Sequence, residues 1–250
     1  MSESPAAAFY ARRGGPLADW WTLLHPPYTV WHLSYVVLGA AMAPARDWAS
    51  LGLGLAAFFL ALGVSAHALD ELTGRPLGTS ISDGALRSVG VLALAGAVVI
   101  GIIGVFFWPS PVNWPVLVAV PIGVMLVVGY NLELFGGRLH TDAAFALAWG
   151  GFPVAVGYLA QSPPFHARDI VAAACAVLTG VGTSAAQRAL STPARRLRRR
   201  TFAVEGTVTS DDGSVAPVDR AFLLAPAEGA LRALSWAVPL VAVAALLAGS

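Results

Sequence analysis

Residues 88–107, SVGVLALAGAVVIGIIGVFF, form a stretch of 20 residues that contains no ionisable side chain. A helix of about 20 apolar residues is long enough to cross the ~30 Å hydrocarbon layer of a membrane. The composition of the whole chain agrees, because 57% of its 250 residues are hydrophobic and only 12% are charged. Ordinary soluble domains have about 25% charged residues, so we expect an integral membrane protein.

Apolar runs separated by turn-forming residues predict about seven transmembrane helices, in a single all-α domain that covers residues 1–250. The expected spans are residues 28–43, 50–68, 86–107, 112–130, 143–160, 169–190 and 232–249. Small residues within these runs suit close packing of helices in lipid. The single cysteine, Cys175, excludes a disulfide framework and a cysteine-rich metal site.

The cationic side chains are distributed unequally between the two faces of this arrangement. All fifteen are arginines, and if the N-terminus is cytoplasmic, thirteen lie on the cytoplasmic face and only Arg46 and Arg168 on the other. Cytoplasmic loops carry the excess of positive charge in membrane proteins. We therefore expect a protein of a prokaryotic plasma membrane with a cytoplasmic N-terminus, whose partners include membrane lipids and exclude nucleic acids.

The longest polar connection, residues 191–231, is expected to be an arginine-rich cytoplasmic loop. Five arginines are clustered in this loop: Arg195, Arg196, Arg198, Arg199 and Arg200. Such a cluster is typical of a segment that anchors to anionic lipid or fixes topology. Arg188, nearer the bundle, is a candidate for binding a diphosphate. Residues 201–220, TFAVEGTVTSDDGSVAPVDR, place β-branched residues around a DDG turn and predict either a small hairpin or a flexible loop.

The second expected span ends in the stretch HALDELTGRPLG, residues 67–78, where ionisable side chains gather. His67, Asp70 and Glu71 share one helix face, since they stand at positions i, i+3 and i+4. The two carboxylates, Asp70 and Glu71, are candidate ligands for Mg²⁺ together with a phosphate group. The alternative is a solvated helix end at the membrane interface.

Arg75 follows in a glycine and proline turn, where its guanidinium is a candidate for bidentate phosphate binding. The alternative is a salt bridge from Arg75 to Asp70 or Glu71. In the stretch SISDG, residues 80–84, Ser82 or Asp83 is expected to cap the third span.

A second group of ionisable residues lies in the loop before the fifth span and contains Glu133, Arg138, His140 and Asp142. His140 is the functional candidate among them, because an imidazole can take or give a proton near neutral pH. Asp142 has an alternative role as the N-cap of the fifth span. We expect His67, Asp70, Glu71, Arg75 and His140 to converge in one cavity that opens to the cytoplasmic face.

The order of these elements resembles the UbiA superfamily of intramembrane prenyltransferases. Three stretches carry the resemblance: LLHPPYTVWHLSYVVLGAAMA (residues 23–43), HALDELTGRPLGTSISDGALRSVGVLALAGAVVIG (residues 67–101) and GGRLHTDAAFALAWGGFPVAVGYLA (residues 136–160). The second is similar to the aspartate-rich first motif of that family. The position of the second aspartate-rich motif is occupied by AAQRALSTPARRLRRR (residues 185–200), which contains no acid.

The resemblance implies a transferase that acts on an isoprenyl diphosphate and a lipophilic or aromatic acceptor. Together with the residue chemistry above, it makes Asp70, His67 and His140 the candidate catalytic residues, Arg75, Arg138 and Arg188 the candidate substrate-binding residues, and Asp70 and Glu71 the candidate ligands of Mg²⁺. Since the second acidic motif is missing, two other hypotheses stay open. One is a non-catalytic lipid-binding or assembly protein with a membrane-protein partner, and the other is a transporter or metalloenzyme built on His67, Asp70 and His140.

Overall fold

The computed structural model describes residues 7–106, 113–161 and 166–248, and these are almost entirely helical. Within them, six helices are long and apolar enough to cross a membrane, which confirms an integral membrane protein of the all-α class. The six are Trp48–Leu72, Asp83–Phe106, Trp114–Asn131, Asp142–Leu159, Ala167–Arg199 and Arg220–Ala248.

The chain begins with two helices that are shorter than these spans, α1 (Pro16–Leu24) and α2 (Pro26–Ala41). The span Trp48–Leu72 consists of α3 (Trp48–Phe58), the π-helix η1 (Phe59–Ala66) and α4 (His67–Leu72). The next spans are α5 (Asp83–Phe106) and α6 (Trp114–Asn131), followed by the short turn η2 (Phe135–Gly137). The remaining helices are α7 (Asp142–Phe145), the π-helix η3 (Ala146–Gly151), α8 (Phe152–Leu159), α9 (Ala167–Arg199) and α10 (Arg220–Ala248).

Helix α2 corresponds to the first expected span, residues 28–43, which is the one not among these six helices, and it has 16 residues. At 1.5 Å per residue it is about 24 Å long, shorter than the hydrocarbon layer. Trp31 and Tyr35 of α2 are fully buried, and their polar atoms are satisfied within the bundle. The Trp31 indole donates to the Tyr35 hydroxyl at 2.6 Å, and that hydroxyl lies 2.7 Å from the hydroxyl of Thr183.

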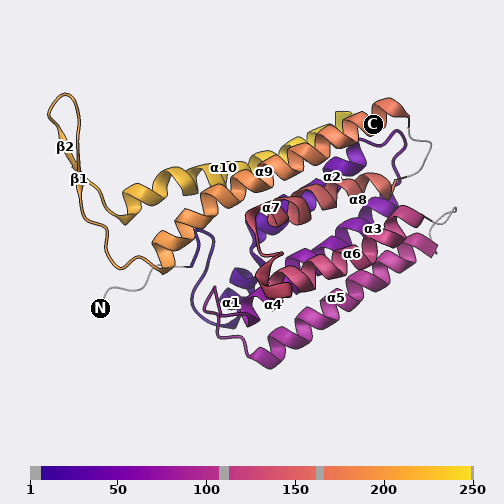
Figure 1. The fold of residues 1–250 in the computed structure, drawn as a ribbon, viewed down its shortest axis with the longest axis horizontal. Helices are drawn as coiled ribbons and strands as arrows, with labels where there is room; N and C mark the ends of the chain where they lie inside the picture. Colours follow the sequence, from indigo (N-terminus) through magenta and orange to yellow (C-terminus); the bar gives the residue numbers. More distant parts are fainter. Residues whose placement is uncertain (1–6, 107–112, 162–165, 249–250) are drawn as a thin grey trace.

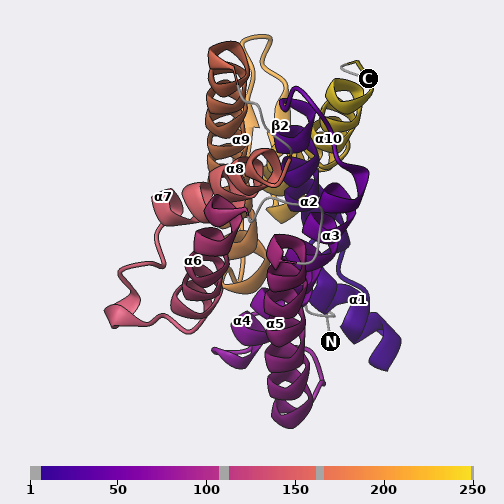
Figure 2. The same cartoon turned by 90° about the vertical axis from the view of Figure 1, so that its right-hand side faces the viewer.

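The helices form a bundle in which α9 and α10 run side by side along one edge and α5 lies at the opposite edge (Figures 1 and 2). Helix α2 packs against both α10 and α8, while α5 packs against α3, η1 and α6. The end of the bundle that carries the arginines also carries the hairpin between α9 and α10 (Figure 1).

The expected loop of residues 191–231 is much shorter in the structure, because α9 continues to Arg199 and α10 begins at Arg220. A helix of 33 residues is about 50 Å long, so α9 can cross the membrane and still extend beyond it. The apolar run ends near residue 190 while the backbone hydrogen bonds continue. Between the two helices, β1 (Thr207–Thr209) pairs antiparallel with β2 (Val215–Pro217), which confirms the hairpin rather than the flexible loop.

Glycines allow two close helix crossings. A Cβ atom at Gly150 of η3 would lie 2.2 Å from the carbonyl oxygen of Gly180 in α9, and one at Gly157 of α8 would lie 2.3 Å from the carbonyl oxygen of Val36 in α2. No side chain fits at either point. Small residues permit such close backbone approach in membrane proteins.

We predict that Gly150→Ala lowers the stability of the folded protein by about 1–3 kcal/mol, the usual cost of overpacking. Gly182→Ala is the matched control. Gly182 lies in α9 two residues after Gly180, the partner of Gly150 at the crossing, and a Cβ atom at Gly182 meets nothing within 4 Å. It should be neutral or slightly stabilising, since alanine favours helix by up to ~1 kcal/mol over glycine. Thermal unfolding in detergent measures both, and equal unfolding temperatures for the two variants would contradict the crossing.

Candidate functional site

A large polar cavity lies at the arginine-rich end of the bundle, with a volume of about 930 Å³. Residues from α2, α4, α6 and α9 line it, together with the N-terminal segment and the loop before α7. Among the described residues, seven arginines line the cavity: Arg75, Arg188, Arg195, Arg196, Arg198, Arg199 and Arg200. The acids in its lining are Asp70, Glu133 and Glu228, so positive charge is in excess.

Helix α9 supplies five of these seven arginines, and three of the five share one face. Arg188, Arg195 and Arg199 stand at i, i+7 and i+11, which places them on the same side of a helix. Arg188 pairs with Asp142, with 2.7 Å between Nε and Oδ1, and Arg198 forms a two-pronged ion pair with the buried Glu228 of α10.

Arg195 differs from these two arginines. It is half-buried, and among the described residues no carboxylate pairs with it. A guanidinium held there without an acid is suited to an anionic ligand.

Asp70 and His67 lie on the opposite wall, where the π-helix η1 passes into α4. His67 is fixed by a hydrogen bond of 3.0 Å between its Nδ1 and the carbonyl oxygen of Gly63. Asp70 is half-buried, and its carboxylate has no hydrogen bond or ion pair within the described part of the chain. Both side chains are therefore available to a ligand in the cavity.

Glu71 does not line this cavity. Its side chain is fully buried, and its carboxylate accepts hydrogen bonds from the backbone N–H groups of Leu77 and Thr79 at 2.8 and 2.9 Å and from the Thr79 hydroxyl at 2.9 Å. These contacts hold the turn after α4. The spacing of Asp70 and Glu71 placed both carboxylates on one helix face, but the chain folds back over Glu71 and occupies its oxygens.

Arg75 lines the cavity, although its charge is balanced locally. It pairs with Asp83 at the start of α5 and donates to the carbonyl oxygen of Ile81 at 2.6 Å. The alternative of a salt bridge to Asp70 or Glu71 is thus replaced by one to Asp83. Ser82 caps α5 by accepting from the N–H of Ala85.

The loop before α7 contributes His140 but not Arg138. His140 lines the cavity, its ring is stacked on Tyr130 at 4.4 Å, and its Nδ1 lies 3.2 Å from the carbonyl oxygen of Tyr130. Arg138 is exposed and is not part of the cavity lining. The cap of α7 is Thr141, whose hydroxyl accepts from the N–H of Ala144, so Asp142 is free to pair with Arg188.

Several polar residues of the cavity were not among the predicted site residues, and they include His25, His32, Tyr130 and Gln187. His25 stacks on His67 at a centroid distance of 4.2 Å. Burial, and then the neighbouring His67, lower the pKa of His25 well below its usual value, which keeps this imidazole neutral. The hydroxyl of Tyr130, the side-chain oxygen of Gln187 and Nε2 of His25 are buried and have no hydrogen-bond partner among the described residues.

The N-terminal segment, residues 7–10, forms part of the cavity lining and is held there by contacts with the helices. The guanidinium of Arg199 donates to the carbonyl oxygen of Ala7 at 3.1 Å, and the indole of Trp21 donates to that of Tyr10, also at 3.1 Å. The ring of Tyr10 packs against His25 at 5.2 Å and Tyr28 at 5.3 Å.

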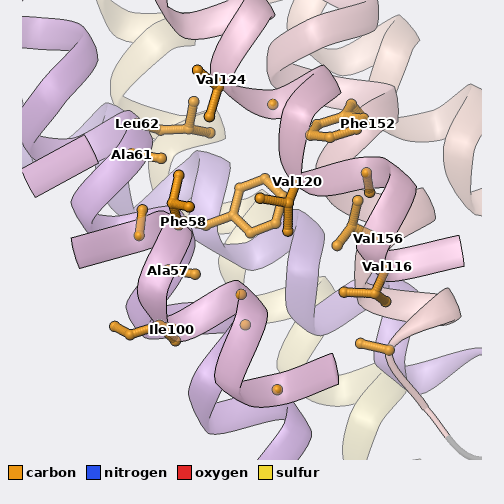
Figure 3. Close-up of a pocket in the computed structure, with 18 of the residues that line it drawn as sticks. Ala57, Phe58, Ala61, Leu62, Ile100, Val116, Val120, Val124, Phe152 and Val156 are labelled. Carbon is orange, nitrogen blue, oxygen red and sulfur yellow. The ribbon is translucent and has the colours of Figure 1, made fainter. Parts of the chain in front are cut away.

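A second, apolar pocket of about 120 Å³ lies deeper in the bundle, between α3 with η1, α5, α6 and η3 with α8. Figure 3 shows the ring of Phe58 near its centre, with Val120 beside it and Phe152 and Val156 on the far wall. Trp149 of η3 lines both this pocket and the polar cavity. Both spaces therefore contact this one residue.

The donor set does not fit Mg²⁺ held by the pair Asp70 and Glu71, because only Asp70 reaches the cavity and both oxygens of Glu71 are occupied. The described residues contain no group of three or more histidine, cysteine, aspartate or glutamate side chains placed to hold a metal ion. Magnesium binding stays a prediction.

Comparison of the chain with models of protein families, with curated proteins and with solved structures found no match.

We predict that substitutions of two adjacent acids differ in their effect on stability. Glu71→Gln should destabilise the protein by about 1–3 kcal/mol, because one of the three hydrogen bonds to a buried carboxylate then meets an amide N–H. Asp70→Asn should leave the unfolding temperature unchanged, since no described residue bonds to its carboxylate. Thermal unfolding of both variants in the same detergent tests the assignment, and a less stable Asp70→Asn would show that Asp70 has a structural role.

Proposed function

We propose that this chain is an intramembrane protein of the UbiA-like kind, which binds an isoprenyl diphosphate and transfers its prenyl group to a lipophilic or aromatic acceptor. The observation that carries the proposal is that Trp149 lines both an arginine-rich cavity and an apolar pocket. A ligand that fits both spaces has a strongly anionic head joined directly to a hydrocarbon chain. An isoprenyl diphosphate has this form.

The polar cavity suits the diphosphate. Guanidinium groups bind phosphate oxygens with two parallel hydrogen bonds, and seven arginines line the cavity against three acids. One of the acids, Glu228, is already engaged with Arg198. The unpaired Arg195 in the middle of the arginine face is the residue we assign to the diphosphate.

The apolar pocket suits the first part of the prenyl chain. A cavity of roughly 150 Å³ accommodates a benzene ring, so about 120 Å³ is space for one short apolar segment. Several lining residues, among them Val98, Val120 and Val124, are only half-buried. Part of the pocket wall therefore reaches the surface of the bundle, and we propose that the rest of a longer chain leaves the pocket there and lies in the lipid.

The chemistry we propose relies on the arginines. When the allylic C–O bond of the substrate breaks, the diphosphate leaves with the electron pair, and preorganised positive charge at that point stabilises the leaving group. The apolar wall formed by Phe145 and Trp149 limits the access of water to the allylic cation. No step in this scheme depends on a metal ion.

We further propose that α2 is a seventh span and that the N-terminus is cytoplasmic. The excess of arginine at one end of the bundle supports this orientation. The diphosphate cavity then opens to the cytoplasm, where water-soluble diphosphates are available, while the chain pocket lies at membrane depth.

A lipid-binding protein that does not catalyse transfer is the second candidate. The observation that favours it is that residues 185–200, at the position of the second aspartate-rich motif of the UbiA superfamily, contain no acid. The two candidates predict the same ligand and differ in turnover.

The test is binding of radiolabelled farnesyl diphosphate to the protein in lipid nanodiscs, with excess chelator present. We expect Arg195→Gln to weaken binding at least tenfold, because a hydrogen bond to a charged group contributes about 1.5–3 kcal/mol and tenfold corresponds to about 1.4 kcal/mol. Arg138→Gln, which changes an exposed arginine outside the cavity, is the matched control and should bind like the unaltered protein.

Two results would contradict the proposal. Equal binding by Arg195→Gln and the unaltered protein would show that the diphosphate lies elsewhere, and loss of binding in chelator would show that a metal ion is required. Binding without any transfer to membrane lipids or aromatic acceptors would favour the lipid-binding candidate.

A further inference from the structure

Histidine is concentrated in the polar cavity. Four of the five histidines of the chain line it, namely His25, His32, His67 and His140, and the fifth, His166, is exposed at the start of α9. Three of the four make the same contact. Nδ1 of His32, His67 and His140 lies 3.0, 3.0 and 3.2 Å from the backbone carbonyl oxygens of Trp149, Gly63 and Tyr130, respectively.

These contacts fix the tautomer of each ring. A carbonyl oxygen only accepts hydrogen bonds, so Nδ1 carries the hydrogen in all three imidazoles. When Nδ1 carries the hydrogen, Nε2 of an unprotonated imidazole has a lone pair that can accept a hydrogen bond. No described residue donates a hydrogen bond to any of these three Nε2 atoms. The cavity thus offers these three imidazole nitrogens as hydrogen-bond acceptors, besides the carboxylates of Asp70, Glu133 and Glu228.

The arginines and the three imidazoles therefore recognise different kinds of group. The arginines of α9 are donors only, and an anionic diphosphate satisfies them. A fully ionised diphosphate has no hydrogen to donate, so it cannot form hydrogen bonds to the Nε2 atoms of the three imidazoles. Full occupation of the cavity requires a second group that donates hydrogen bonds.

We propose that the second ligand of the cavity is a protic nucleophile, an alcohol or amine, and that Nε2 of His67 accepts its proton. This inference rests on the proposed function. The oxygen or nitrogen lone pair of the nucleophile forms a bond to the allylic carbon, the C–O bond to the diphosphate breaks and its electron pair leaves with the diphosphate. The O–H or N–H proton passes to His67, which becomes an imidazolium.

The surroundings of His67 distinguish it from the other two imidazoles. Asp70 stands one helical turn further along on the same face, and it is the acid of the cavity for which no bond to a described residue is found. Stacking against His25 at 4.2 Å and the bond to Gly63 hold the ring in one orientation. His32 and His140 orient the nucleophile.

The informative variant is His67→Asn. An asparagine amide can still donate to the carbonyl oxygen of Gly63, in place of Nδ1–H, but it has no group at the position of Nε2. His166→Asn is the matched control, because His166 lies outside the cavity. Thermal unfolding of both variants verifies that the fold is kept, and His67→Gln, which reaches the Nε2 position, is the second variant if His67→Asn does not fold.

The first measurement compares two probes that differ only in the hydrogen-bond donor, farnesol and farnesyl methyl ether, in protein saturated with inorganic diphosphate. We expect farnesol to bind about tenfold more tightly than the ether. His67→Asn should reduce that preference at least threefold and His166→Asn should not change it. Equal binding of alcohol and ether by the unaltered protein would overturn the inference.

The second measurement is single-turnover transfer from farnesyl diphosphate to added alcohols and amines. We expect His67→Asn to slow transfer by about 10²–10⁴-fold, the usual contribution of a general base, while farnesyl diphosphate binding stays unchanged. Added imidazole should restore part of the rate. Unchanged transfer in His67→Asn would overturn the assignment of His67, whereas failure of the unaltered protein to bind farnesyl diphosphate would overturn the proposed function instead.

Discussion

Helix α9 lies in direct backbone contact with the π-helical turn η3, because neither Gly150 nor Gly180 has a side chain at the crossing. This contact sets the distance and the rotation of α9 relative to the rest of the bundle. Seven residues beyond Gly180 along the helix comes Gln187, followed by the arginines that line the polar cavity. Since α9 is continuous to Arg199, the crossing also places Arg195 opposite Asp70 and His67.

The same turn, η3, organises the boundary between the two spaces. Its residue Trp149 lines the polar cavity and the apolar pocket, and the backbone carbonyl of Trp149 fixes His32. Ionisable groups near membrane depth are costly and are retained where they have a function. Arginines and histidines line one of the two spaces that contact Trp149, and hydrocarbon side chains line the other. An amphiphilic ligand requires this arrangement.

Much of the helical architecture could be predicted from the sequence, since uninterrupted apolar runs such as residues 88–107 leave little alternative to a membrane span. The ends of helices were harder to predict. The arginine-rich segment after residue 190 was expected to be a loop, because polarity marks the end of the membrane and not the end of a helix. Its arginines were accordingly assigned to lipid anchoring, although the spacing of Arg188, Arg195 and Arg199 fits one helix face.

Spacing alone gave part of the site. It was sufficient to place His67 and Asp70 on one face, and these residues line one cavity with Arg75, His140 and Arg188. It could not separate Asp70 from Glu71, because the turn that satisfies Glu71 comes from Leu77 and Thr79, further along the chain. His25 and His32 were missed for a similar reason, since the tertiary packing of α2 brings them into the cavity.

The most direct measurement is an experimental structure of the protein in lipid nanodiscs with a non-hydrolysable farnesyl diphosphate analogue. We predict density for the diphosphate in contact with Arg195 on the arginine side of Trp149, and density for the first isoprene unit beside Phe58 on the other side. A diphosphate bound outside the cavity, or a prenyl chain that does not pass Trp149, would contradict it.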